Sequence, residues 1–154
     1  MLSQKAKYAL KALLALAECG EGELLQAGEI AEKYNIPKKF LDLILLELRR
    51  HKLVDSRRGK KGGYLLGKPA ETIMIGDIIR VIDGPLAPIP CASVTAYRRC
   101  ADCHDERTCA IRKMMREVRD AAAAILDHRT LADAVGPKKA RKAKIQRRTL
   151  RKVA

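Results

Sequence analysis

The feature that most limits the fold of this chain is a helix, a tight turn and a second helix, followed at once by a glycine-rich loop. Apolar residues recur at helical spacing over 27–34 and again over 38–51. Asn35-Ile36-Pro37 between them predicts a turn, because Asn tolerates tight backbone geometry and Pro opens a helix at its first position. Two short strand-like pieces then flank a loop within 53–66, which predicts a β-hairpin. Together these elements predict a winged helix-turn-helix, a fold that lets one helix enter a DNA groove.

Helical patterns continue on both sides of this motif. Ser3 is a suitable N-cap for a first helix that ends at Gly20, and residues 75–82 predict a fourth helix. Aromatic residues make up only 3% of the chain, with no Trp, so Leu, Ile, Ala and Val must build the core. In the third helix, the expected apolar face consists of Phe40, Leu41, Ile44, Leu45 and Leu48.

A long helix is expected near the C-terminus, capped by Thr108 and running to about Asp127, and 130–133 resembles a capping box for a last short turn. An apolar stripe on the long helix needs a cover, either from a partner subunit or from its own domain. We expect a homodimer formed through residues of about 109–126. The stripe consists of Ile111, Met114, Met115, Val118, Ala122 and Ile125.

The predicted fold class is therefore mainly α with a small β-hairpin: a winged helix-turn-helix domain plus a long C-terminal dimerisation helix. Residues 1–84 form the expected DNA-binding domain, and 85–108 form a cysteine-rich loop whose prolines and cysteines argue against regular structure. Residues 109–136 carry the dimerisation helix and a short terminal helix. Residues 137–154 are expected to be a disordered basic tail.

Positive charge on the second helix of the motif and on the hairpin tip predicts contact with double-stranded DNA. Side chains at the start of the helix are expected at base edges or flanking phosphates, and the hairpin tip at the backbone or minor groove. The alternative for the hairpin is an ordinary solvated loop. The expected DNA-binding residues are Ser3, Lys5, Lys38, Lys39, Phe40, Asp42, Arg57, Arg58, Gly59, Lys60 and Lys61.

The net charge of +14 is concentrated in the tail, where 137–154 holds nine Lys and Arg and no acid. This tail predicts either added affinity for DNA or only a solvated extension.

No apolar run approaches the roughly 18 residues of a membrane span, and the N-terminus lacks the uninterrupted apolar stretch of a signal peptide, so a cytoplasmic protein without membrane contact is expected. No Ser/His/Asp set or phosphate loop is apparent, so neither an enzyme nor a small-molecule substrate is expected.

Several of these motifs resemble the Rrf-two (Rrf2) family of winged-helix regulators, which includes the iron–sulfur cluster regulator and the nitric-oxide-sensitive repressor. The resemblance covers about residues 1–135, and its most specific part is the Arg-Gly-x-x-Gly-Gly-Tyr hairpin of 58–64. Further matches lie at 1–10, at Ile30-Ala31 before Ile36-Pro37, and at 76–84. The resemblance implies a dimer bridged by the long helix, a palindromic operator, and a cluster loop in which Cys91, Cys103 and Cys109 are ligands.

The fourth cluster ligand departs from the family pattern. Arg112 stands where the iron–sulfur cluster regulator has a ligating His, and Tyr8 stands where the nitric-oxide-sensitive repressor uses an Asp. The segment from Cys91 to Cys103 is longer than in the best-known members and contains an extra thiol, Cys100. Cys100 and His104 are therefore the local candidates for the fourth ligand, with Cys100 favoured.

Four thiols within 19 residues are suited to an iron–sulfur cluster, with the two-iron type favoured over the four-iron type. Zinc held by Cys100, Cys103, His104 and Cys109 is an alternative, as are thiol redox switching and inert cysteines. The expected function is a DNA-binding transcriptional regulator, acting as a repressor, that senses redox, iron or nitric-oxide status through the cluster. The alternative is a regulator of the same fold without a cluster, controlled by a ligand, a partner protein or thiol oxidation, or carrying structural zinc.

Overall fold

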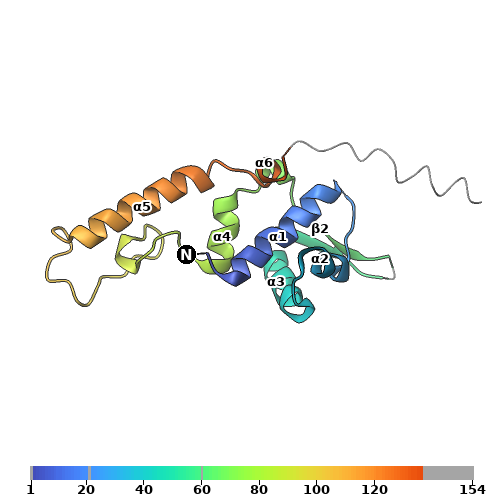
Figure 1. Cartoon of the computed structure of the whole chain (residues 1–154), viewed down its shortest axis with the longest axis horizontal. Helices are drawn as coiled ribbons and strands as arrows, with labels where there is room; N and C mark the ends of the chain where they lie inside the picture. The colour runs from blue at the N-terminus through green and yellow to red at the C-terminus, as the bar shows by residue number, and fades with distance from the viewer. Residues whose placement is uncertain (1, 21, 60, 137–154) are drawn as a thin grey trace, which may run out of the picture.

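The helix-turn-helix and hairpin expected from the sequence are present in the computed structural model, which describes residues 2–20, 22–59 and 61–136. Figure 1 shows the order of the elements along this part of the chain. The helices are α1 Gln4–Cys19, α2 Ala27–Tyr34, α3 Lys38–Arg50, α4 Ile75–Asp83, α5 Ala110–Leu126 and α6 Leu131–Val135, with 3₁₀ turns η1 Ala70–Thr72 and η2 Pro90–Ala92. The strands β1 Val54–Arg57 and β2 Gly63–Leu66 pair antiparallel, with Val54 opposite Leu66 and Arg57 opposite Gly63. The predicted fold class is confirmed.

Local sequence signals account for most helix ends. The Ser3 hydroxyl accepts a hydrogen bond from the Ala6 amide at 3.0 Å, which caps α1 as expected. Asn35 ends α2 in the left-handed region, with φ 51°, and this conformation makes the tight turn before α3. The sequence predicted Pro37 as the first residue of α3. In the structure Pro37 is the N-cap, one position before the first helical residue, Lys38.

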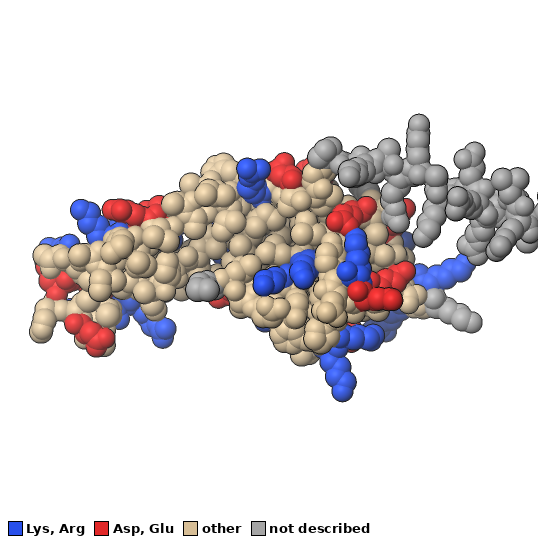
Figure 2. Space-filling model, in the orientation of Figure 1, with Lys and Arg blue, Asp and Glu red and all other residues tan. Residues whose placement is uncertain are grey.

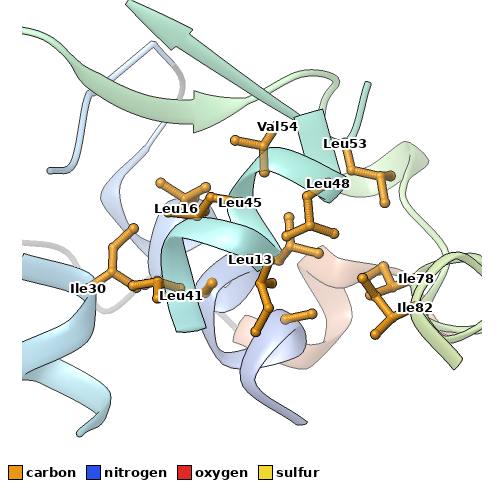
Figure 3. Close-up of a cluster of buried hydrophobic side chains, with 14 of the residues drawn as sticks. Leu13, Leu16, Ile30, Leu41, Leu45, Leu48, Leu53, Val54, Ile78 and Ile82 are labelled. Carbon is orange, nitrogen blue, oxygen red and sulfur yellow. The ribbon is translucent and has the colours of Figure 1, made fainter. Parts of the chain in front are cut away.

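The core lies where α1 crosses α3, α4 and α6. Leu13 and Leu16 of α1 meet Leu41, Leu45 and Leu48 of α3, as Figure 3 shows together with Ile30, Leu53, Val54, Ile78 and Ile82. The expectation of an aliphatic core is therefore confirmed. Phe40 was expected on the same apolar face, but it is 37% exposed and packs edge-on against Tyr8, because its position is at the margin of the buried stripe.

Helix α5 extends from the body of the molecule and carries the cysteine loop at its far end (Figure 1). The C-terminal end of α5 is attached firmly to α4, because Arg80 donates two hydrogen bonds of 2.7 Å to the Asp127 carboxylate. Gly76 allows this approach, since a Cβ there would lie 2.0 Å from Asp127 Oδ1. The chain then returns to the body, where the Leu131 amide bonds to the Ile73 carbonyl at 2.8 Å.

The caps of the last two helices differ in how well the sequence predicted them. The capping box at Thr130 and Asp133 is confirmed, with hydrogen bonds of 2.9 and 3.0 Å. The expected cap at Thr108 is wrong, because its hydroxyl donates to the Asp105 carbonyl and Cys109 is the N-cap of α5. A cysteine therefore lies at the junction between the loop and the long helix.

Candidate functional site

The solvent face of α3 is a line of four exposed side chains opposite the buried leucines. Lys39, Leu43, Leu46 and Arg50 are three or four residues apart, so they lie along one side of the helix. Leu43 is 62% exposed and Leu46 is 39% exposed. Neither leucine was among the residues predicted to contact DNA, although the helical spacing from Lys39 could have placed Leu43 on the outer face.

Both carboxylates on this part of α3 are paired with lysines. Asp42 lies 3.4 Å from Lys38 Nζ, one helical turn earlier, and Glu47 lies 2.6 Å from Nζ of Lys5 in α1. These pairs reduce the negative potential that phosphate groups would meet at the helix. Lys5, expected to contact DNA, thus already has a partner within the protein, and its contact with DNA stays a prediction.

Ser3 also has a structural role. Besides capping α1, its hydroxyl and amide both donate to the carboxylate of Asp83 at the end of α4, the amide at 2.8 Å. This contact joins residues 80 positions apart and fixes the start of α1. The predicted contact of Ser3 with DNA is not tested by this arrangement.

The hairpin presents its basic residues to solvent. Arg57, Arg58, Gly59 and Lys61 are all exposed, and Figure 2 shows Lys and Arg side chains projecting along the lower edge of the molecule and at its hairpin end. Lys60, also expected to contact DNA, lies outside the described residues. Gly59 has φ 113°, a conformation that a residue with a Cβ adopts only under strain, and this glycine turns the chain at the tip.

The two consecutive glycines at the end of the tip are required by close backbone contacts. A Cβ on Gly62 would lie 2.2 Å from the Arg57 carbonyl oxygen. A Cβ on Gly63 would lie 2.6 Å from the Leu25 carbonyl oxygen, because the backbones of Leu25 and Tyr64 exchange hydrogen bonds of 2.9 and 2.7 Å. The Gly-Gly-Tyr sequence therefore ties the hairpin to the segment before α2 and sets its position beside the helix-turn-helix.

The cysteine loop is held to α5 by two arginines that lie two helical turns apart. Arg112 Nε donates to the Cys91 carbonyl at 2.9 Å, and Arg119 Nη1 donates to the neighbouring Ala92 carbonyl at 2.5 Å. Arg112 also lies over the ring of Tyr97, at 6.0 Å from its centroid. Arg112 occupies the position where the family resemblance places a ligating His, and here its side chain fastens η2 to the long helix.

Cys103 interacts with two other thiols of the loop, Cys109 and Cys100. Cys103 Sγ lies 3.8 Å from Cys109 Sγ, and Cys109 Sγ accepts the Arg112 amide as the cap of α5. Hydrogen bonding to Cys109, and then to Cys100, raises the pKa of Cys103 to about 12. Donation from the Arg112 amide lowers the pKa of Cys109. Cys109 is therefore the member of this pair that ionises first.

The thiols of the loop are suited to bind a soft metal, and the positions of two of them, Cys103 and Cys109, fit a shared metal centre. Two thiolates on one tetrahedral centre with metal–sulfur bonds of about 2.3 Å lie roughly 3.8 Å apart, as Cys103 and Cys109 do. Cys91 is buried in η2, and His104 is exposed. Within residues 2–20, 22–59 and 61–136, no group of three or more His, Cys, Asp or Glu side chains is placed to hold a metal ion.

The apolar stripe of α5 is open to solvent within the described chain. Ile111, Met114, Val118 and Ile125 are 61%, 53%, 48% and 62% exposed. The contacts that α5 makes with η2 and α4 involve side chains outside this stripe. In the part of the chain that the structure describes, no helix is both long and apolar enough to cross a membrane.

Comparisons with known proteins agree on one family. The family model named Rrf2, described as an iron-dependent transcriptional regulator, matches residues 2–137. An Rrf2-like HTH-type transcriptional regulator of Rhodobacter capsulatus is 48% identical over 136 residues, which cover 86% of this chain and 91% of that protein. The HTH-type regulator Rv1287 of Mycobacterium tuberculosis is 36% identical, covering 88% of this chain and 81% of its own length.

Two solved structures have the same fold. CymR, the global cysteine regulator of B. subtilis, superposes with a TM-score of 0.73 at 32% identity, over 88% of this chain and 95% of that one. IscR of T. potens superposes with a TM-score of 0.69 at 27% identity, over 88% and 85% of the two chains.

Proposed function

This chain belongs to the Rrf2 family of transcriptional regulators, and from that premise we propose that it is a homodimeric, cytoplasmic repressor that binds a palindromic operator and senses its signal at the cysteine loop. As a member of this family it is a DNA-binding regulator and not an enzyme.

The observation that carries the proposal is a continuous set of contacts from the cysteine loop to the DNA-binding domain. Cys109 caps α5, and Arg112 and Arg119 attach η2 to the same helix. At the other end of α5, Arg80 of α4 donates two hydrogen bonds to the Asp127 carboxylate. Helix α4 packs on α1, and α1 packs on α3, so a change at the cysteines can reach α3 through α4 and α1.

For DNA binding, α3 is proposed to enter the major groove while the hairpin contacts the adjoining backbone or minor groove. Lys38 and Lys39 lie at the start of α3, and Arg57, Arg58 and Lys61 are exposed at the hairpin. In a dimer that pairs the exposed stripes of α5, two copies of this surface would face half-sites about one helical turn apart, or a multiple of it.

For sensing, the loop is proposed to bind an iron–sulfur cluster, the two-iron type favoured, through Cys91, Cys103 and Cys109 with Cys100 as fourth ligand. A bound cluster would supply a centre that responds to oxidants, iron supply or nitric oxide. Cys103 and Cys109 are already adjacent, and Arg112 contributes a backbone amide at the Cys109 sulfur. Hydrogen bonds to cluster sulfurs are one means by which a protein adjusts the reduction potential.

Anaerobic reconstitution tests this assignment. The protein is expected to show visible charge-transfer absorption and an iron Mössbauer spectrum, both abolished in Cys91→Ser, Cys103→Ser and Cys109→Ser and changed or abolished in Cys100→Ser. Cys19→Ser, outside the loop, is the matched control and should keep both signals. Stoichiometric zinc in place of iron, with dependence on Cys100, Cys103 and Cys109 alone, would contradict the cluster and indicate a structural zinc site.

A second candidate sensor is favoured by the 3.8 Å contact between Cys103 and Cys109. A peroxide would oxidise one thiolate to a sulfenic acid and release hydroxide, and the other thiol would then form the disulfide with loss of water. The sulfurs need to approach to about 2.05 Å, which a short loop of five intervening residues permits. Peroxide treatment of iron-free protein should then remove two hydrogen masses from the wild type but not from Cys103→Ser, while Cys91→Ser behaves as the wild type.

A further inference from the structure

We propose that Leu43 selects thymine in the operator, by packing its side chain against the 5-methyl group of that base in the major groove. The inference rests on the proposed function, because it takes α3 as the helix that enters the groove.

Leu43 is exposed at the centre of the outer face of α3. Leu43 is 62% exposed, whereas Leu41, Ile44, Leu45 and Leu48 on the same helix are fully buried. Leu43 therefore contributes little to the core that positions α3. Its side chain is therefore available for contact with a partner at the outer face of α3.

On this face Leu43 lies between two cationic side chains. Lys39 and Arg50 lie on the same side of α3 and are eleven residues apart, a distance of about 16 Å along a helix that rises 1.5 Å per residue. The major groove is about 12 Å wide. The two cations can therefore reach phosphates on the opposite walls of the groove, which leaves Leu43 and Leu46 over the base edges between them.

Asp42 and Glu47, the carboxylates nearest to this face, are paired with Lys38 and Lys5 at 3.4 and 2.6 Å. The strip from Lys39 to Arg50 thus presents positive ends and an apolar middle. This pattern matches a nucleic acid groove better than an acidic or apolar protein surface.

Base edges in the major groove present hydrogen-bond donors, acceptors and a single kind of apolar group, the methyl of thymine. A leucine at a base edge cannot hydrogen-bond, so it favours the base with the methyl and leaves the polar edge of any other base without a partner. Leu46 is only 39% exposed, and we assign it a flanking role beside Leu43.

The test replaces thymine by uracil, which removes only the methyl group. The operator is first obtained by selecting tight binders from random double-stranded DNA with the purified protein. Each thymine is then changed to uracil in both half-sites, and affinity is measured for the wild type, for Leu43→Ala and for Val94→Ala. Val94 is an exposed apolar residue of the cysteine loop, 75% exposed, and serves as the matched control.

At one thymine of each half-site, uracil should weaken wild-type binding by about fourfold per half-site, the effect of one buried methyl group. The same uracil should leave the affinity of Leu43→Ala unchanged, while Val94→Ala should respond as the wild type. Thermal unfolding of Leu43→Ala should match the wild type, because the side chain is exposed.

Two results would overturn the inference: no thymine whose methyl matters to the wild type, or a sensitive thymine at which Leu43→Ala responds like the wild type. Failure of the proposed function would look different. In that case the selection would yield no specific sequence, and Lys39→Ala and Arg58→Ala would bind DNA as the wild type does.

Discussion

A glutamate at Val118 should separate the two subunits of the proposed dimer. Val118 lies in the middle of the α5 stripe and is 48% exposed in the single chain. In a dimer that covers this stripe, the exposed half of the side chain becomes buried in each subunit. Val118→Glu removes that gain and places a carboxylate in an apolar contact.

The magnitude follows from the exposed fraction. Full burial of a valine side chain is worth about 1.5–3 kcal/mol, so burial of the remaining half contributes about 0.8–1.5 kcal/mol. Two copies in a symmetric dimer contribute about 1.5–3 kcal/mol, which corresponds to a dissociation constant raised roughly 10- to 150-fold. This is a lower bound, because an unpaired carboxylate buried at the interface adds a desolvation penalty.

Sedimentation velocity over a range of protein concentrations measures this change directly. The matched control is Ala124→Glu, which introduces the same side chain on the same helix at an exposed position about 120° away from Val118. We expect Ala124→Glu to dimerise as the wild type does and Val118→Glu to be monomeric at the same concentrations. A wild-type monomer, or a Val118→Glu protein that dimerises normally, would refute the assignment of α5 as the dimer interface.

Three further predictions concern the hairpin, the α4–α5 junction and the tail. Arg58→Ala should weaken operator binding by about 1–3 kcal/mol in a gel-shift titration, whereas Lys113→Ala on the outer side of α5 should not; equal affinities would remove the hairpin from the interface. Asp127→Asn should lower the free energy of unfolding in urea by about 0.5–1 kcal/mol at pH 7, a value that allows for partial exposure of the pair. Because Arg80 lowers the pKa of Asp127, the stabilisation is present above the unfolded carboxyl pKa of about 4 and is lost as the pH falls through the native value, so the two proteins should converge in acid. Deletion of 137–154, which lies outside the described residues, should reduce the slope of log K against log salt by about 0.9 for each phosphate that the tail neutralises, and an unchanged slope would show that the tail does not bind DNA.

The sequence alone determined the elements whose signals are local. Apolar spacing and caps placed α1, α2, α3 and α4, because a helix is specified by contacts between residues three or four positions apart. The hairpin was placed by the two short strand-like pieces that flank its glycine-rich loop. Asn35 and the Thr130–Asp133 box were recognised for the same reason. The family, and with it the role of the chain as a transcriptional regulator, followed from the spacing of a few motifs, above all the hairpin of 58–64.

Only the tertiary structure decided which polar side chains are engaged within the protein. The partners of Ser3, Lys5 and Arg80 lie on other elements, so no local pattern distinguishes them from residues that face DNA or solvent. Leu43 lay outside the predicted apolar face, but its 62% exposure became evident only once the opposite side of α3 was seen packed in the core. The cysteines show the same limit: their spacing indicated ligand chemistry, but the contact of Cys103 with Cys109 and the burial of Cys91 depend on how the loop folds against α5. Contacts between distant segments are selected by the packing of the whole chain, and this packing assigned each of these side chains its neighbour.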